Sequence, residues 1–337
     1  MGNDNLILLG HGSGGRLMRE LIEKVFLRHF GMHAGLADSA SISVDGSSLA
    51  YTTDSFVVDP LFFPGGNIGK LAVSGTVNDL STCGAIPKFI SCGFIIEEGF
   101  RIADLDKIVE SMASEAKKAG VRIVTGDTKV VKRDQCDKLY INTSGIGYLP
   151  EDRKHICTGE TIRPGDKIIV SGTLGDHAIT ILSEREGLTT GHQLESDVAP
   201  LNNLTEKILG QPENIRFMRD ITRGGLATIL AEICENKTFG IEIEEGRIPV
   251  RESVRSISEL YGFDPLFLAN EGKMLFIVKK ETDEKILRQL HTEETGKDAT
   301  IIGEVTEEHQ GIAVLKSVIG GKRIIEMLGG EILPRIC

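Results

Sequence analysis

The first regular pattern of apolar and polar positions lies near the N-terminus. An apolar run, LILL, leads through a glycine-rich loop, GHGSGGR, into the segment RLMRELIEKVFLRHF (16–30). In this segment Leu17, Leu21 and Val25 recur at helical spacing, and further apolar residues stand beside them. The spacing predicts an amphipathic helix that is ended by Gly31.

Between residues 48 and 150, strand-like and helix-like segments alternate with short links. One helix-like segment is rich in small residues, so we expect it to pack closely against a neighbour. Alternation of this kind favours an α/β-type domain. The predicted strands cover 48–60, 88–99, 121–128 and 138–150, and the predicted helices cover 67–85 and 101–119.

A charged, irregular stretch over 151–166 separates this run from a second one that starts at residue 167. The second run has predicted helices over 222–237, 253–260 and 282–292, and predicted strands over 241–245, 273–278, 299–305 and 312–316. The predicted fold class is α/β (α+β), with two α/β domains and a flexible C-terminal tail. The predicted parts are an N-terminal segment (1–34), domains over 35–150 and 160–316, and a tail over 317–337.

The composition argues against nucleic-acid-binding, membrane and secreted proteins. The chain has 337 residues, enough for two domains, and a formal net charge of −11. Such an acidic chain is a poor match for nucleic acid or an anionic membrane surface, because both attract clustered Lys and Arg. No CxxC pair occurs among the six cysteines, no stretch approaches a membrane span, and the start does not resemble a secretory signal. We therefore expect a cytoplasmic protein with reduced thiols.

The glycine-rich loop is the first candidate ligand site. Gly10, Gly12 and Gly15 fit the GxGxxG spacing, but no acidic residue follows at the distance that a dinucleotide fold requires. A Walker A loop is excluded, because Arg16 and Leu17 stand where it has Lys and Ser or Thr. Free backbone amides before a helix still favour an anion, although a merely flexible loop remains the alternative.

Aspartates are the second candidate site. Five of them follow apolar stretches or stand beside glycine and small polar residues, and carboxylates on such turns can hold Mg²⁺. Any one of them can equally be an ordinary turn or cap residue. Arg223, followed by Gly224 and Gly225, adds a cation and backbone amides that suit a phosphate. The five aspartates are Asp38, Asp54, Asp79, Asp127 and Asp220.

The order and spacing of TTDSF, VNDLS, TGDT and RDITRGGL resemble the ATP-binding superfamily of aminoimidazole ribonucleotide synthetase and selenophosphate synthetase. The resemblance covers residues ~35 to ~310. It implies two domains of the aminoimidazole ribonucleotide synthetase type, with ATP bound through Mg²⁺ on the five aspartates. The implied nucleotide-binding residues are Gly12, Ser13, Gly14, Gly15, Asn78, Gly126, Thr128, Arg223, Gly224 and Gly225.

The two ends of the chain indicate one family within this superfamily. The GHGSGGR start and the terminal PRIC resemble the HypE family, the carbamoyl dehydratases of nickel–iron hydrogenase maturation, while the lack of a Cys before Cys83 argues against selenophosphate synthetase. The family resemblance implies a homodimer whose Cys337 receives a carbamoyl group from the carbamoyltransferase HypF. ATP-dependent dehydration would then give a thiocyanate, and the cyanide would pass to the HypC–HypD complex for the hydrogenase iron.

The same resemblance implies an active site with Cys337, Glu271 and Lys129. Glu271 is a candidate for the base, Lys129 pairs with it or contacts the phosphates, and His11 has a weaker claim. Gly329 and Gly330 give the tail freedom to visit two sites. Two other functions stay open: a synthetase or kinase that acts on a free small molecule, and a nucleotide-binding partner protein without catalysis.

Overall fold

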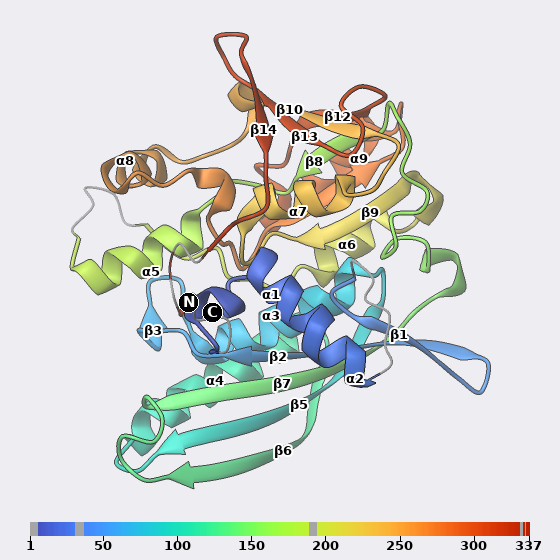
Figure 1. Ribbon diagram of the computed structural model, residues 1–337. Helices are drawn as coiled ribbons and strands as arrows, with labels where there is room; N and C mark the ends of the chain where they lie inside the picture. The colour runs from blue at the N-terminus through green and yellow to red at the C-terminus, as the bar shows by residue number, and fades with distance from the viewer. Residues whose placement is uncertain (1–5, 31–36, 189–193, 331–332, 334) are drawn as a thin grey trace.

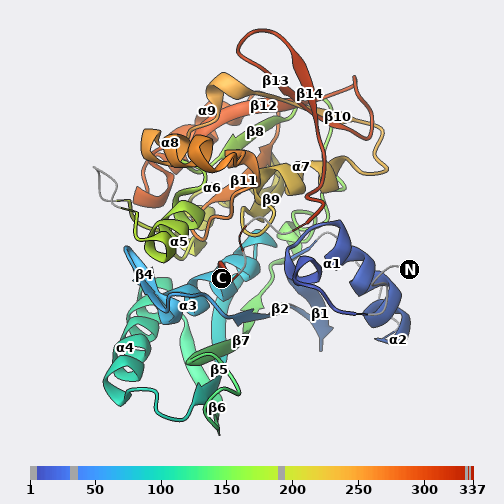
Figure 2. The ribbon, with the colours of Figure 1, turned by 60° about the vertical axis from the view of Figure 1, so that its left-hand side comes forward.

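The computed structural model describes residues 6–30, 37–188, 194–330, 333 and 335–337 of the chain. Two sheets with helices packed on them form its lower and upper halves in Figure 1. Most neighbouring strands are antiparallel, so the fold is the α+β form of the predicted class. Figures 1 and 2 both show the C-terminus between the two halves.

The N-terminal sheet has five strands in the order β1-β2-β7-β5-β6. Helix α3 (Ile68–Thr82) packs on β2 and β7, and α4 (Ile102–Ala119) packs on α3. Nearly every residue of α3 is buried, which confirms the close packing that its small residues predicted. The strands are β1 (Ala40–Val44), β2 (Ser47–Phe56), β5 (Ile86–Glu97), β6 (Arg122–Val131) and β7 (Leu139–Tyr148), and a separate ribbon consists of β3 (Phe62–Phe63) and β4 (Gly66–Asn67).

The other face of the five-stranded sheet is open. Tyr51, Phe89 and Ile146 lie next to one another on three adjacent strands and are each about two-fifths exposed. Edge strand β6 has exposed residues on both of its faces. Apolar side chains in such a position indicate a surface that another molecule covers.

The C-terminal sheet has seven strands in the order β14-β13-β10-β12-β8-β11-β9. Helix α7 (Gly225–Cys234) contributes to the core on one face, and α6 (Asn202–Ile208) and α9 (Asp283–Leu290) contribute to the core on the other. Helix α5 (Asp176–Glu186) packs against β3 of the first domain and against α8 (Glu252–Tyr261). The strands are β8 (Lys167–Val170), β9 (Ile215–Asp220), β10 (Gly240–Glu244), β11 (Met274–Val278), β12 (Thr300–Thr306), β13 (Ala313–Lys316) and β14 (Lys322–Ile325).

Several segments differ from the sequence prediction. Strands β1 and β9 and helix α6 were not predicted, because they are short and lack a clear apolar period. Strand β14 lies within the segment predicted as tail and pairs with β13. The N-terminal helix forms as α1 (Arg16–Leu21), a π-helical stretch (Ile22–Leu27) and α2 (Arg28–Phe30). Its predicted apolar face is not buried, since Val25 remains 45% exposed.

One apolar core joins the two domains. It combines side chains of α3, α4 and β5 with Ala178 and Ile179 of α5, and it includes Ile336 near the end of the tail. Docking of the tail therefore buries apolar surface in the space between the domains. Within the described residues, no helix combines the length and the apolar character that crossing a bilayer demands.

Candidate active site

A cavity of about 740 Å³ lies between the two domains. Residues from the N-terminal loop, both domains and the tail line it, and many of them are charged. The lining includes eight of the residues singled out in the sequence: Asp38, Asp54, Asp79, Asp220, Arg223, Glu271, Cys337 and Gly14.

Four aspartates reach this cavity from different elements. Asp54 lies near the end of β2, Asp79 in α3, and Asp220 at the end of β9, while Asp38 precedes β1. Gly75, one turn before Asp79, lets the Phe56 ring of β2 pack against α3, because a Cβ there would stand only 3.1 Å from that ring. The close packing of α3 on β2 therefore brings carboxylates from separate motifs into one site.

The electrostatics of the site show a concentration of negative charge. Burial, and then the carboxylate of Asp220, raise the pKa of Asp79 well above its usual value. Burial and then Asp38 have the same effect on the pKa of Asp220. Burial also raises the pKa of Asp54, while nearby Arg223 opposes this. A cation in the cavity would relieve this mutual repulsion.

The carboxylates fit Mg²⁺ bound with phosphates better than an all-protein metal site. No group of three His, Cys, Asp or Glu side chains in the described ranges forms a ready metal cage. Asp38 Oδ2 is buried and has no hydrogen-bond partner, although Asp38 Oδ1 pairs with Arg219 Nε at 2.9 Å. Mg²⁺ commonly takes one or two carboxylates and completes its shell with water and phosphate oxygens.

Glu271 is the acid with the largest effect on the pKa of the Cys337 thiol. Its side chain is 3% exposed, and Oε1 has no hydrogen-bond partner. Its backbone N–H donates to Asp197 Oδ1 at 3.0 Å, which fixes its position before strand β11. Burial, and then the neighbouring Asp54 and Asp220, raise the pKa of Glu271 well above its usual value.

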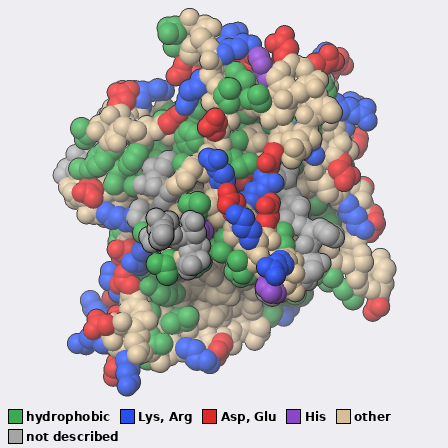
Figure 3. All heavy atoms as spheres, in the orientation of Figure 1, with side chains coloured by type: hydrophobic (Ala, Val, Ile, Leu, Met, Phe, Trp, Pro, Cys, Tyr) green, Lys and Arg blue, Asp and Glu red, His purple; other side chains and the backbone are tan. Residues whose placement is uncertain are grey.

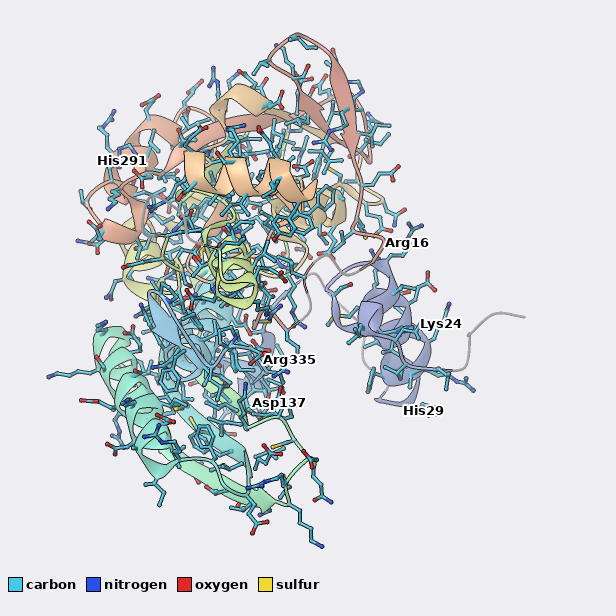
Figure 4. The ribbon with its side chains drawn as sticks, turned by 90° about the vertical axis from the view of Figure 1, so that its left-hand side faces the viewer. Arg16, Lys24, His29, Asp137, His291 and Arg335 are labelled. Carbon is cyan, nitrogen blue, oxygen red and sulfur yellow. The ribbon has the colours of Figure 1, made fainter. Side chains whose placement is uncertain are left out.

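The tail enters the site and is held there by its backbone. Val57 N–H donates to Cys337 O at 2.9 Å, and Asp59 N–H donates to Arg335 O at 3.3 Å. The Arg335 guanidinium binds Val57 O at 3.0 Å and pairs with Asp137, as Figure 4 shows. These contacts place the Cys337 thiol in the cavity.

Removal of the thiol from water changes its chemistry. Burial raises the pKa of Cys337, and Glu271 adds to this effect, whereas Arg223 opposes it. A docked Cys337 is therefore a neutral thiol at neutral pH, and a neutral thiol is a weak nucleophile.

The N-terminal loop covers this region. Arg223 Nη1 donates to Gly12 O at 2.9 Å, and a Cβ on Gly15 would stand 2.2 Å from Leu328 O. Arg19 of α1 pairs with Glu235 just after α7. Charged side chains of both signs gather where α1 meets α7, in the middle of the face in Figure 3. Ser13 and Gly224 line a second cavity of about 240 Å³ beside the tail.

Other predicted site residues are not in the cavity. Asp127 and Lys129 lie on β6, at the open face of the sheet, and form an ion pair at 2.7 Å. Gly126 and Thr128 lie on the same strand. Asn78 is buried, but its amide binds Ala199 O and Leu201 N–H, so it braces the chain near the site. His11 caps its own loop by accepting from Leu8 N–H at 3.0 Å.

Two residues near the site were missed by the sequence analysis. Arg219 pairs with Asp38. It stands beside Asp220 in the motif MRDITRGG, which the sequence analysis used only for its aspartate and for Arg223. His177 in GDHAIT binds the tail, and a lone histidine in an apolar helix gave no such signal. Their partners are far away in sequence.

The comparisons with known proteins agree in family. Residues 36–149 match the N-terminal domain of AIR synthase related proteins. Residues 163–316 match the C-terminal domain of the same proteins. The carbamoyl dehydratase HypE of Rhodobacter capsulatus is 46% identical, with 99% of each chain covered. A solved HypE–HypF complex has a TM-score of 0.85 at 48% identity and covers 91% of this chain and 99% of that one.

A solved structure of HypE in complex with ATP has a TM-score of 0.82 at 47% identity, covering 98% of this chain and 100% of that one. The similarity thus extends over both domains and the segments at the two ends.

Proposed function

The chain belongs to the HypE family of carbamoyl dehydratases, within the AIR synthase related proteins, and from this premise we propose that it uses ATP to dehydrate a carbamoyl group on its own Cys337 to a thiocyanate. The observation that carries the proposal is the docked tail. It brings the terminal thiol into a cavity lined by four carboxylates, Arg223 and Glu271.

The reaction requires activation of the carbamoyl oxygen, which is a poor leaving group. The carbamoyl oxygen attacks the γ-phosphorus of ATP, and ADP leaves. The carbamoyl nitrogen then gives up its protons while the C–O bond to phosphate breaks and the carbon–nitrogen triple bond forms. The products are the thiocyanate on Cys337, ADP and phosphate. Positioning and charge neutralisation dominate catalysis of such a phosphoryl transfer.

The residues of the cavity divide these tasks. Arg223 lies beside the thiol, where its cation attracts the phosphate. When bound, Mg²⁺ would supply charge neutralisation at the phosphates, held by Asp38, Asp54, Asp79 and Asp220. Glu271 as a carboxylate accepts one proton from the carbamoyl nitrogen, and the second proton leaves with the departing phosphate. Its raised pKa favours the protonated form once Glu271 has taken up that proton.

The raised pKa of the docked thiol supports loading of Cys337 outside the cavity. The tail would leave its site, receive the carbamoyl group from HypF and return, with Gly329 and Gly330 as its hinge. The solved HypE–HypF complex supports HypF as the partner. We propose HypC–HypD as the cyanide acceptor, and the cytoplasm as the location, because free cysteines such as Cys337 suit a reducing compartment.

We also propose a homodimer through the open face of the N-terminal sheet. Asp127 and Lys129 share that face with the exposed Tyr51, Phe89 and Ile146. A second copy packed there would bury the apolar side chains and carry Asp127 toward its partner. The predicted metal role of Asp127, and the predicted roles of Gly126, Thr128 and Lys129, depend on such a second copy.

Potassium cyanate provides a test of the dehydratase, because it carbamoylates thiols without a partner protein. The treated protein receives MgATP and is digested, and the C-terminal peptide is weighed. We expect loss of one water from the peptide with Cys337, dependent on ATP. Cyanate with a heavy-oxygen label should transfer its oxygen to inorganic phosphate, which ATP hydrolysis by water would not do.

Two variants serve as controls. Asp79→Ala should keep the carbamoyl group on Cys337 intact, and Cys337→Ala should release no labelled phosphate. If the wild-type thiocarbamate persists in protein that binds MgATP, self-dehydration is wrong and a free small molecule becomes the substrate to seek.

A further inference from the structure

A histidine distant in sequence holds the last peptide carbonyl of the chain. His177 Nε2 lies 2.7 Å from Ile336 O, and His177 Nδ1 lies 2.7 Å from Ser196 Oγ. The ring is fully buried in α5. Figure 2 shows the C-terminus beside this helix. Both ring nitrogens are therefore engaged, one with the tail and one with the segment that precedes α6.

The partners decide where the ring proton sits. Ser196 Oγ accepts from Val198 N–H at 3.2 Å, so its own proton is available to His177 Nδ1. A carbonyl oxygen only accepts, so Nε2 carries the ring proton and donates it to Ile336 O. Burial lowers the pKa of His177, in agreement with a neutral ring. The Ile336 carbonyl thus fixes the tautomer, and the Ser196 hydroxyl supports it by donating to Nδ1.

The same short segment also positions Glu271. Ser196 orients His177, while the next residue, Asp197, accepts from the Glu271 backbone N–H at 3.0 Å. Ser196 is itself fixed, because its N–H donates to Pro64 O at 2.9 Å. One segment therefore sets the depth of the tail and the place of the acid that faces the thiol.

We propose that His177 is a positioning residue: oriented by Ser196, it binds the Ile336 carbonyl. This bond holds the Cys337 sulfur at the depth in the cavity where Glu271 lies. This inference rests on the proposed function for its purpose, but the contact itself concerns only the docked tail. The Val57 N–H bond to Cys337 O holds the carboxylate of the terminal residue. Together the two bonds define how far the terminal residue enters the cavity.

The test measures access to the thiol and needs no ATP. The full-length protein is treated with iodoacetamide, and alkylation of the peptide after Lys322 is followed by mass spectrometry. Cys234, which is fully buried in the C-terminal domain, reports global unfolding in the same sample. We expect His177→Leu to raise the ratio of Cys337 to Cys234 alkylation about fivefold to tenfold, the effect of one buried hydrogen bond.

Two further variants separate positioning from packing. His177→Gln can donate from its amide to Ile336 O and should stay within about twofold of wild type. Ser196→Ala leaves the histidine whole but removes the partner that orients the ring at Nδ1, and should raise the ratio by less than His177→Leu does. Unchanged ratios in both His177→Leu and Ser196→Ala overturn the proposal, as does a His177→Gln ratio equal to that of His177→Leu.

The positioning proposal and the dehydratase proposal can be refuted independently of each other. A raised ratio in His177→Leu and Ser196→Ala, with His177→Gln near wild type, supports positioning even where wild-type protein forms no thiocyanate. Conversely, dehydration by wild-type protein with unchanged ratios would refute only the role of His177.

Discussion

At the residue scale, the site depends on acids that the fold keeps from their usual ionisation. Glu271 has no partner at Oε1, and carboxylates surround it. An acid in this state is suited to take a proton from a bound substrate and return it. His11, the weaker candidate for the base, and Lys129, the expected partner of Glu271 or the phosphates, do not line the cavity in this chain.

Glu271→Gln should separate binding from chemistry. The amide keeps the shape of the side chain but accepts no proton, so we expect the dehydration rate to fall by about 10²- to 10⁴-fold. Affinity for MgATP, measured by calorimetry, should change little, because Arg223 and the aspartates remain. A rate close to wild type would assign the proton transfer to another residue.

At the element scale, two helix starts place groups in or near the site. Helix α7 begins at Gly225, whose φ of +64° is costly for any residue with a Cβ. Helix α5 begins at Asp176 and carries His177 to the tail. Both starts tolerate few substitutions, but for different physical reasons.

Gly225→Ala should destabilise the protein by more than about 2 kcal/mol, because backbone strain adds to a clash. A Cβ there would stand 2.3 Å from Leu266 O. Gly262→Ala is the matched control, since its φ is +73° but no atom lies within 4 Å. Urea unfolding of the two variants measures the difference. Equal losses would show that the close approach to Leu266 has no cost.

Asp176 should make stability depend on pH. Burial raises its pKa to about 6, although Thr173 and Arg251 bind the carboxylate and oppose this. An acid with a higher pKa in the fold than in the unfolded chain stabilises the fold while protonated, and this stabilisation is lost as the pH rises through about 6.

We therefore expect Asp176→Asn to gain about 1 kcal/mol relative to wild type between pH ~5 and pH ~7. The difference between the free energies of unfolding of the two proteins, measured in urea at each pH, removes the contributions of other titrating groups. A difference that is constant with pH would contradict a raised pKa for Asp176.

At the scale of the whole molecule, the open sheet face and the interdomain cavity are related, because predicted site residues lie on both. Four of the predicted site residues lie on β6, outside the cavity of their own chain. A dimer through this face would explain both their position and the exposed apolar side chains.

Ile146→Asp should weaken the dimer, because it puts a charge between Tyr51 and Phe89 in the centre of the open face. Sedimentation velocity should show a shift toward monomer. Ile102→Asp is the control, since Ile102 is 84% exposed at the start of α4 and lies outside the sheet. A dimer that persists in Ile146→Asp would locate the interface elsewhere.

Mixing two inactive variants would test whether Asp127 acts in the partner's site. Asp127→Ala lacks the acid, and Cys337→Ala lacks the thiol. A mixed dimer has one site that contains an intact Cys337 and the partner's Asp127, so the mixture should regain dehydration. If Asp127 acts within its own chain, mixing restores no activity.

Local patterns in the sequence predict the order of most helices and strands and the candidate residues of the site. Periodic spacing placed α3, α4 and β11 within a few residues, because the buried faces of these elements are continuous in sequence. The motifs around Asp54, Asp79 and Asp220, with the terminal Cys337, identified the family.

Which of these residues come into contact depends on how the chain packs. Packing of α3 on β2 and β9 brings Asp54, Asp79 and Asp220 together, whereas the edge position of β6 keeps Asp127 on another face. The bond from His177 to Ile336 O spans 159 positions, and no local pattern encodes it. Such contacts arise when distant segments bury apolar surface together, which is a property of the packed chain as a whole.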